Sequence, residues 1–576
     1  MANPPEQDTQ HALLVVWGQF AREIGLISGL EAVKLNQKTY EHPPQAKVLE
    51  FLVAILSGAK YLQEISLAAH PLDKDLTLAQ AWGQNGWADY SGVSRTLSGL
   101  SWAEVRALVA VLEQVGQPFI DRELKLLRSL GQPVREDGDL TGIPVSNTSR
   151  TYPNAAYGHM ADEIRLGYQA GVTSLHSPTY GRLWLSVEHH AGDTVSCTQA
   201  EALVLAAEKR TGLRPRRRTE LLQGRIEAFQ KERQPTEKRL ESQKAALEKV
   251  RSAKQETQAQ LQEAQLTPGT KPERIHSLER RCIRREQAIA VAQKRLEKTL
   301  RLLQAHYEQE KVLQARLQRF EQENADNPDP IEICFRMDAG FGTYDNMALL
   351  IEMGYELYTK LHNHKVVQAL QKLVQPENTW TRVGKNAEMV AWPELKLEHC
   401  PYPLHVGLER FHTGDKKLKH SALAYFGNVS VTEDLPAWFG AYNGRQTIEA
   451  GIKETKQVFY LHRLKVRSEP AIYLQEAMTI FAANFIRWAT VWIEQHSQPD
   501  ENQLQIGNMG IKRQVQVVAH TSAKVIQYSE GMLLKFSPAS SLAGKSLQFR
   551  ALESPIRPKY FLPFFTILAL IVQKLR

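Results

Sequence analysis

Cysteine is scarce in this sequence, and closely spaced cysteine pairs are missing. The 576 residues include four cysteines, which lie far apart and form no C-x-x-C pair: Cys197, Cys282, Cys334 and Cys400. A disulfide framework and a thiolate zinc site both need cysteines that are more numerous or more closely spaced. The sequence therefore indicates neither, and it is typical of a cytoplasmic protein with reduced thiols.

The sequence also lacks the apolar segments of a secreted or membrane protein. The N-terminus reads Met-Ala-Asn-Pro-Pro-Glu-Gln-Asp, which is polar and acidic and unlike a signal peptide. The apolar tail at 561–572 contains a proline and is far shorter than the roughly 20 residues of a membrane span. We expect the tail to pack on the body or on another subunit, and we expect no membrane partner.

The composition is that of a globular protein with a basic bias. Hydrophobic residues make up 43% of the chain and charged residues 23%, and the formal net charge is +8. A chain of this length has room for several domains. The positive balance favours an acidic polymer as partner.

Helical periodicity dominates residues 1–130, so we expect an all-α N-terminal domain. Within it, residues 89–98 follow a short helix-like run and a glycine-containing turn. This pattern predicts a helix-turn-helix whose second helix offers Ser94, Arg95 and Ser98 to a DNA groove. A plain helical pair is the alternative.

Two aspartates form a first acidic segment. Asp137 and Asp139 lie in the run Val-Arg-Glu-Asp-Gly-Asp-Leu-Thr at 134–141, and on a strand they point to the same side. Only one of them is needed as a metal ligand, and the residues alone leave the choice open.

A second acid follows an apolar strand. Residues 332–337 read Glu-Ile-Cys-Phe-Arg-Met and lead to Asp338, which opens the glycine-rich turn Asp-Ala-Gly-Phe-Gly. Open sheets place ligand sites at such strand ends. We expect a helix at 346–353 and another strand at 354–361 to follow.

A third acid lies in a predicted helix at 441–456. At about 100° per residue, Glu449 shares an arc of about 60° with Tyr442, Arg445 and Lys456, and Lys453 lies beside the same arc. One carboxylate among cations and a phenol suits a metal-held phosphodiester, because the acid binds the metal while the cations hold phosphates. An exposed helix face with mixed charges is the alternative.

The spacing of these four residues resembles a known signature. Tyr, two residues, Arg, three residues, Glu, six residues, Lys is similar to the segment around the last acid of bacterial insertion-sequence transposases with an Asp-Asp-Glu active site. Asp139-Leu140-Thr141 looks like the end of the first core strand in that family, and the segment from Asp338 looks like its second acid region. The resemblance selects Asp139 over Asp137.

A long charged insertion separates the first two acids. Residues 219–322 are rich in Glu, Gln, Lys, Arg, Leu and Ala, and their strong breakers cluster at 268–272. Apolar residues at alternating spacings of three and four predict two equal arms of an antiparallel coiled-coil hairpin, each reaching roughly 70 Å. The second seam runs through Ile275, Leu278, Cys282, Arg285, Ile289, Ala292, Leu296, Thr299, Leu303, His306, Glu310, Leu313, Leu317 and Phe320. We consider two roles for the hairpin. It bridges two protomers or braces bound DNA, or it is a solvated spur without a function of its own.

The remaining segments complete the predicted organisation. We expect catalytic-core segments at 131–218, 323–362 and 421–500, a β-rich insertion at 363–420, and a small C-terminal subdomain with the apolar tail at 501–576. Short strands are predicted at 515–520, 525–528 and 532–536. The basic stretch at 461–467 offers Arg463 and Lys465 to backbone phosphates.

The resemblance implies a ribonuclease-H-like α/β core and a DNA transposase. Asp139, Asp338 and Glu449 are then the catalytic acids and ligands of Mg²⁺, for which Mn²⁺ substitutes. Tyr442, Arg445 and Lys456 hold the DNA beside them. The implied partners are double-stranded DNA, as element ends and target, and a second copy of the chain in a nucleoid-associated synaptic dimer. The alternatives are a transposase-derived DNA-binding protein and a coiled-coil DNA scaffold, neither of which cleaves.

Overall fold

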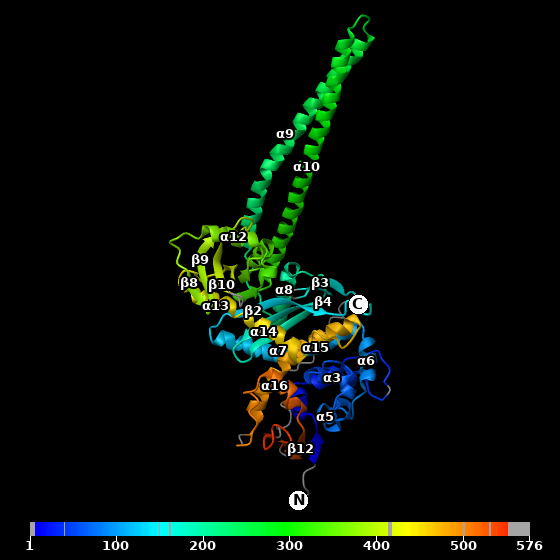
Figure 1. Ribbon diagram of the computed structural model, residues 1–576, viewed down its shortest axis with the longest axis vertical. Coiled ribbons are helices and arrows are strands. Elements are labelled where there is room, and N and C mark those ends of the chain that lie inside the picture. The colour runs from blue at the N-terminus through cyan, green and yellow to red at the C-terminus, as the bar shows by residue number, and fades with distance from the viewer. Residues whose placement is uncertain are drawn as a thin grey trace.

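A large mixed sheet runs through the middle of the molecule, between a long helical arm and a cluster of N-terminal helices and C-terminal strands (Figure 1). This computed structural model describes residues 6–39, 41–148, 150–160, 163–412, 417–498, 501–528 and 531–550. The chain is therefore an α/β protein, as the sequence predicts.

The centre of the sheet is built from strands on both sides of the long insertion. Strand β2 (Val134–Pro144) pairs antiparallel with β4 (Glu163–Ser177) and parallel with β6 (Ile333–Met337), which in turn pairs parallel with β7 (Glu356–Lys360). The far edge of β4 carries β5 (Gly181–Ala191) and the short β3 (Ala156–Met160), both antiparallel to it. The resulting order β5-β4-β2-β6-β7 has only β4 running against the others.

The sheet continues beyond β7 with antiparallel strands in the order β11 (Leu418–Phe426), β10 (Leu404–His412), β9 (Ala387–Leu395) and β8 (Thr381–Gly384). Strands β8, β9 and β10 fall within the β-rich insertion predicted at 363–420, and most of β11 falls in the core segment predicted after it. A second apolar cluster, separate from the main core, packs here, and Tyr358, Tyr425 and Trp438 form its aromatic centre. This part also contains a helix, α12 (His364–Leu373).

Helices cover the central strands. Helix α8 (Ala200–Thr211) packs on β4 and β5 and also contacts α11 (Tyr344–Glu352). Helix α15 (Glu469–His496) packs on β5 and on α7 (Trp102–Ser129), and α14 (Gln446–Val458) packs on β2 and β5. The apolar length of α15 is consequently buried almost throughout.

The N-terminal helices join the core through α7 and α15. The other helices are α1 (Ala12–Glu23), α2 (Leu26–Glu31), α3 (Pro44–Leu56), α4 (Glu64–Leu67), α5 (Leu76–Ala81) and α6 (Tyr90–Ser98). The predicted second helix of a helix-turn-helix is α6, which Asp89 caps by accepting a hydrogen bond from the Gly92 amide at 2.6 Å. Helix α6 packs on α3 and α4. The predicted second helix is therefore present, but it packs mainly on α3 and α4 and not on the preceding helix α5.

The two ends of the described chain meet in one small sheet. Strand β1 (Glu6–Thr9) pairs with β12 (Ala523–Tyr528), which continues to β13 (Gly531–Phe536) and β14 (Ser546–Arg550). The strand predicted at 515–520 is wrong: the structure has helix α16 (Ile511–Gln516) and a 3₁₀ turn, Val518–His520. The apolar tail at 561–572 lies outside the described residues. No helix in the described ranges is long and apolar enough to cross a membrane.

The insertion at 219–322 forms the arm, which we define as the helices α9 (Thr219–Leu266) and α10 (Pro272–Ala325). The helices have 48 and 54 residues and run side by side away from the sheet (Figure 1). Every buried residue of α10 falls on the predicted seam: Leu278, Thr299, Leu303, Glu310, Leu313 and Phe320. Helix α9 continues through Pro235.

Buried ion pairs fix the base of the arm to the core. The fully buried carboxylate of Glu352, at the end of α11, accepts hydrogen bonds from Arg225 of α9 at 2.6 Å and from Arg316 of α10 at 2.9 Å. The Tyr402 hydroxyl donates to the same carboxylate at 3.0 Å. One acid of the core thereby holds both helices of the arm.

We predict that Glu352→Gln lowers the free energy of unfolding by about 2 to 4 kcal/mol. The substitution leaves Arg225 and Arg316 partly buried without their counter-charge, which is costly. Urea unfolding measures the change. The control is Glu321→Gln, an exposed acid of α10 that we expect to alter stability by less than about 0.5 kcal/mol. Equal effects of the two substitutions would contradict this assignment of the arm's anchor.

Candidate functional site

The first two predicted acids meet because of the parallel register of β2 and β6. Asp137 is paired with Arg336, so Asp139 and Asp338, each two residues further on, reach the same level on neighbouring strands. Adjacent strands lie about 4.8 Å apart. Two acids that are far apart in sequence therefore lie next to each other at one edge of the β2–β6 pair.

The position of Asp139 differs from the prediction in one respect. Asp139 is not at the end of its strand, because β2 continues to Pro144 along its partner β4. It lies instead just beyond the last residue that pairs with β6. Asp338 does follow its strand, and its carboxylate accepts a hydrogen bond from the Gly340 amide at 2.9 Å, which fixes the turn.

The helix that carries the third acid is interrupted within the signature. Helix α13 (Leu435–Asn443) contains Tyr442, and α14 begins at Gln446, so Arg445 lies at the joint between them. The Arg445 amide donates to the Tyr442 carbonyl at 2.9 Å, a tight i to i−3 bond. The prediction of one continuous helix at 441–456 is therefore wrong at Gly444 and Arg445, although both keep helical dihedral angles.

Arg445 joins the first and third acids. Its guanidinium is buried and donates to Asp139 at 2.7 Å and to Glu449 at 2.6 Å. Burial raises the pKa of Asp139 to about 7; Arg445 opposes this rise, while the nearby charges of Asp338 and Glu449 add to it. Asp338 and Glu449 are therefore both close enough to Asp139 to repel its charge, and Arg445 is the cation that opposes this repulsion.

Asp137, the competing first acid, has a structural role. Its buried carboxylate accepts two hydrogen bonds from Arg336 of β6, at 2.6 and 2.9 Å. Arg336 also donates to the Ala441 carbonyl at 2.7 Å, at the end of α13. This pair connects β2 and β6 to the helix joint, and it leaves Asp139 as the acid that faces Asp338.

The other signature residues surround the acids. Burial raises the pKa of Tyr442, whose hydroxyl donates to the Met337 carbonyl at 3.4 Å, directly before Asp338. Burial lowers the pKa of half-buried Lys456, and the charge of Asp139 opposes the decrease. Lys453 is exposed on α14. The structure thus brings Tyr442 and Lys456 to the acids.

The remaining predicted DNA-binding residues lie elsewhere. Arg95 and Arg463 are both exposed, and Arg463 lies over the ring of Tyr61 with its guanidinium 5.4 Å from the ring centre. Lys465 is unsuited to a phosphate, because its ammonium is buried and donates to the Phe459 carbonyl at 3.3 Å. Burial lowers the pKa of Lys465 to about 7.

Sequence reasoning missed two residues at the end of β7. Lys360 is level with Asp338, and its ammonium lies 6.0 Å from the ring centre of Tyr442. Nδ1 of exposed His362 is 3.2 Å from the Ala339 carbonyl oxygen, beside Asp338. A usable signal exists in the sequence: β6 and β7 are consecutive strands joined by a helix, so their carboxyl ends are expected at one edge of the sheet.

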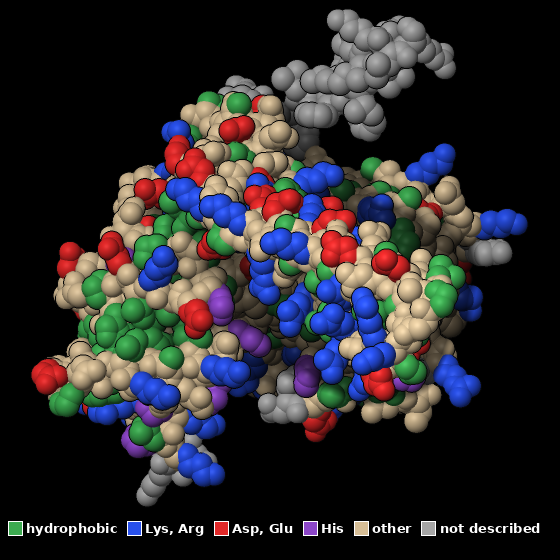
Figure 2. Space-filling view, turned by 90° about the horizontal axis from the view of Figure 1, so that it is seen from above, with side chains coloured by type: hydrophobic (Ala, Val, Ile, Leu, Met, Phe, Trp, Pro, Cys, Tyr) green, Lys and Arg blue, Asp and Glu red, His purple; other side chains and the backbone are tan. Residues whose placement is uncertain are grey.

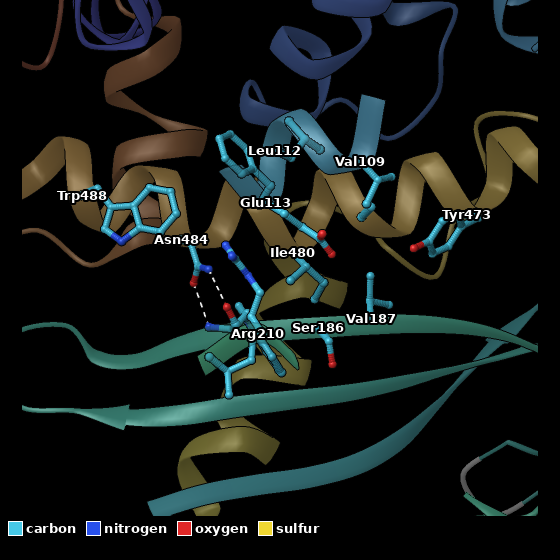
Figure 3. A pocket seen from close by; sticks show the side chains of 14 residues that line it. Val109, Leu112, Glu113, Ser186, Val187, Arg210, Tyr473, Ile480, Asn484 and Trp488 are labelled. Carbon is cyan, nitrogen blue, oxygen red and sulfur yellow. Dashed lines mark hydrogen bonds between the residues drawn. The ribbon is translucent and has the colours of Figure 1, made fainter. Parts of the chain in front are cut away.

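A pocket elsewhere in the core contains none of the predicted site residues. It lies between α7, β5 and α15 and is lined largely by apolar side chains, among them Val109, Ile480 and Trp488 (Figure 3). The side chain of Asn484, which also lines the pocket, makes two hydrogen bonds to the backbone of Trp184. It accepts one from the Trp184 amide at 2.9 Å and donates one to the Trp184 carbonyl at 2.8 Å. Its chemistry is that of core packing.

The acids suit a divalent cation in chemistry. Carboxylate oxygens are the ligands that Mg²⁺ prefers, and the mutual repulsion at Asp139 is what a bound cation relieves. In the described ranges no three His, Cys, Asp or Glu side chains already form a metal-binding group. The reason here is that Arg445 lies between Asp139 and Glu449.

Comparison with known proteins adds no identification. No protein-family model matches the chain, and no curated protein matches it.

We predict that the two neighbouring aspartates respond differently to amidation. Asp137→Asn leaves Arg336 buried and unpaired, so it should cost about 3 to 5 kcal/mol in urea unfolding. Asp139→Asn should cost clearly less, because Arg445 keeps its bond to Glu449 and burial already opposes the Asp139 charge. The opposite order would show that Asp139 is the structural acid.

Lys465 gives a prediction about pH. Its folded pKa of about 7 is below the unfolded value of 10.5, so above pH 7 the unfolded chain binds more protons and stability rises with pH. Between pH 7 and pH 9 this rise should be on the order of 2 kcal/mol. Lys465→Met should remove it in urea unfolding, whereas Arg467→Gln, at an exposed position, should retain it. A Lys465→Met protein with an unchanged pH profile would contradict the burial of a neutral amine.

Proposed function

We propose that this protein is a DNA transposase. In this proposal it binds the ends of an insertion sequence, cleaves them by metal-assisted hydrolysis of phosphodiesters, and joins the 3′-hydroxyls to target DNA. The observation that carries the proposal is the meeting of Asp139, Asp338 and Glu449, from three separate segments, around the one guanidinium of Arg445 or directly beside it. Their order and the signature spacing resemble those of the insertion-sequence enzymes.

The strand order supports a ribonuclease-H-like core. In the series β5-β4-β2-β6-β7 the first three strands in sequence, β2, β4 and β5, form an antiparallel meander, and β6 and β7 add on the other side parallel to β2. The first acid is then on the first strand of the core, the second acid follows the fourth, and the third acid is on a later helix. This is the arrangement that the resemblance implies.

The proposed chemistry assigns each acid and cation a role. Asp139, Asp338 and Glu449 would hold Mg²⁺, or Mn²⁺ in its place, since Mg²⁺ prefers carboxylate oxygens and the single charge of Arg445 does not balance three acids. Bound metal supplies activation of a water or 3′-hydroxyl and stabilisation of the leaving oxygen. Arg445 and Lys456 would hold backbone phosphates beside the acids, with Tyr442 packed against the second acid.

The proposed partners follow from the reaction. Double-stranded DNA is both the cut end and the target, and cutting two ends together requires a synaptic complex, for which we propose a homodimer. Lys453, Arg95 and Arg463 are exposed and suit further phosphate contacts. A transposase of this kind would work in the cytoplasm, at the nucleoid.

One observation favours a second function, a DNA-binding protein that does not cleave. Arg445 bonds to both Asp139 and Glu449 in this arrangement, so two of the three acids are engaged by an internal cation. If Arg445 keeps these two bonds when the protein binds DNA, the role of the acids is to position the arginine. Cleavage requires it to turn from the acids to a phosphate.

We predict that Glu449→Gln abolishes Mg²⁺-dependent nicking while DNA binding is kept. Glu449 is partly exposed, with 59% of its side-chain surface accessible, so the substitution should leave the fold intact. The substrate is a supercoiled plasmid that carries the gene with its flanking DNA, and nicking is followed on gels. Loss of one metal-holding acid should lower the rate at least about 100-fold.

The matched control is Glu433→Gln, an exposed acid just before α13, which should nick at the wild-type rate. Nicking by Glu449→Gln at the normal rate would refute the assigned acid. A wild-type protein that binds the plasmid but does not nick it with Mg²⁺ or Mn²⁺ would favour the non-cleaving function.

A further inference from the structure

The outer half of the arm contains a large excess of positive charge. Residues 238–301, which are the outer parts of α9 and α10 with the turn between them, include 16 Lys and Arg and eight Glu, a net charge of +8. The inner parts of the arm, 219–237 and 302–325, include six Lys and Arg and eight Glu, a net charge of −2. The net charge of the outer half therefore equals the net charge of the whole chain.

The buried residues of α10 give each position on this helix a defined direction. Leu278, Thr299, Leu313 and Phe320 are separated by multiples of seven; Leu303 falls four residues after Thr299, and Glu310 falls seven residues after Leu303. The first four residues occupy position d of a heptad, and Leu303 and Glu310 occupy position a. Both positions face α9. Positions g, c and f then cover one flank and the outward side of α10, whereas e and b cover the opposite flank.

Basic residues of α10 occupy one flank of the outer half. Arg274, Arg281 and Arg295 are at position g, and Arg284 and Lys298 are at position c. These positions are adjacent on the helix, so together with f they span an arc of about 100°. We call these residues, with Arg280, Lys294 and Arg301 at position f, the basic flank.

Acidic residues lie mainly on the other side. Glu279 and Glu286 are at position e and Glu297 is at position b, whereas Glu273, in the first turn of α10, is at position f. Glu286 is paired with Lys254 of α9 at 3.0 Å, and Glu279 with His276 at 3.0 Å. The charges of α10 are therefore separated around the helix, which a spur that needs only solubility does not require.

The side chains of the basic flank are accessible and form no ion pairs among the described residues. All of its residues are exposed, and within the described part of the chain none has a carboxylate within 4.0 Å. Seen from above, Lys and Arg side chains gather over the middle of the molecule, with Asp and Glu side chains among them (Figure 2). Clustered cations without counter-charges are the feature by which proteins bind phosphate backbones.

We propose that the basic flank of α10 binds the backbone of duplex DNA without reading its sequence. The flank extends from Arg274 to Arg301, about 40 Å along the helix, which slightly exceeds one turn of B-DNA at 34–36 Å. Arg301 is 24 residues from the end of α10, so the bound DNA lies about 36 Å or more from the base of the arm. It is therefore a different stretch from the one at the acids. The choice of DNA as the polyanion rests on the proposed function.

The test compares two full-length variants in a Glu449→Gln background, which prevents cutting. The neutralised variant combines R281Q, R284Q, R295Q and K298Q, and the charge-retaining variant combines R281K, R284K, R295K and K298R. Gln, Lys and Arg all favour helices, so both variants should melt at the parent temperature. Binding to a random-sequence 50-base-pair duplex is measured by fluorescence anisotropy from 50 to 300 mM KCl.

The neutralised variant should bind about 10- to 100-fold more weakly at ~0.1 M salt, and its slope of log K against log salt should be smaller by about 2 to 4. The charge-retaining variant should bind within about twofold of the parent. Unchanged binding by the neutralised variant would overturn the proposal, as would equal losses by both variants. An effect confined to a single-stranded RNA of 50 nucleotides would also overturn it.

The result is independent of catalysis. If the neutralised variant loses affinity but the wild-type protein never nicks DNA, the basic flank is retained and the proposed function fails. If the wild-type protein nicks DNA and neutralisation has no effect, the proposed function is retained and the basic flank fails.

Discussion

The parallel pairing of β2 with β6 is the contact on which the candidate site depends. The two strands are joined by the pair Asp137–Arg336, whose members are 199 residues apart and almost completely buried. A buried ion pair is sensitive to geometry, since a displaced partner leaves an uncompensated charge. The pair therefore fixes the register, and the register sets Asp139 beside Asp338. Through the Ala441 carbonyl, the same arginine also fixes the helix joint that carries Arg445.

Burial and repulsion among carboxylates determine the electrostatics of the site. Asp139 is held in a poorly hydrated position near two other acids, which raises its pKa. Arg445 stabilises its charged form, and the charges of the acids in turn offset the cost of burying the Arg445 guanidinium. In the proposed function, a divalent cation would take over part of this compensation. The shared bonds to Arg445 explain why the first and third acids lie close together.

Buried ion pairs also attach the base of the arm to the core, and the excess positive charge of the arm lies in its outer half. Glu352 binds both helices at the base, and a second buried network joins Arg217 to Glu208 and Glu323. These carboxylates pair with the arginines at the base, and the inner arm itself is nearly balanced in charge. The outer half has an excess of cations, and half of its Lys and Arg residues lie on one flank of α10. A firmly attached base would hold that flank in a defined direction relative to the sheet.

Local patterns determined much of this protein by themselves. Strand and helix periodicity located β6, α11 and β7 and the two helices of the arm, and the spacing of buried residues on α10 follows the predicted seam, because short-range periodicity directly reflects which face is buried. Other features depended on long-range contacts. The sequence left Asp137 and Asp139 equivalent in direction, and only the partner strand separates them, since β6 supplies Arg336 to one and ends before the other. The burial of Lys465, the joint at Gly444 and Arg445, and the pairing of β1 with β12 were likewise decided by tertiary packing, because the neighbours that enforce them are remote in the chain.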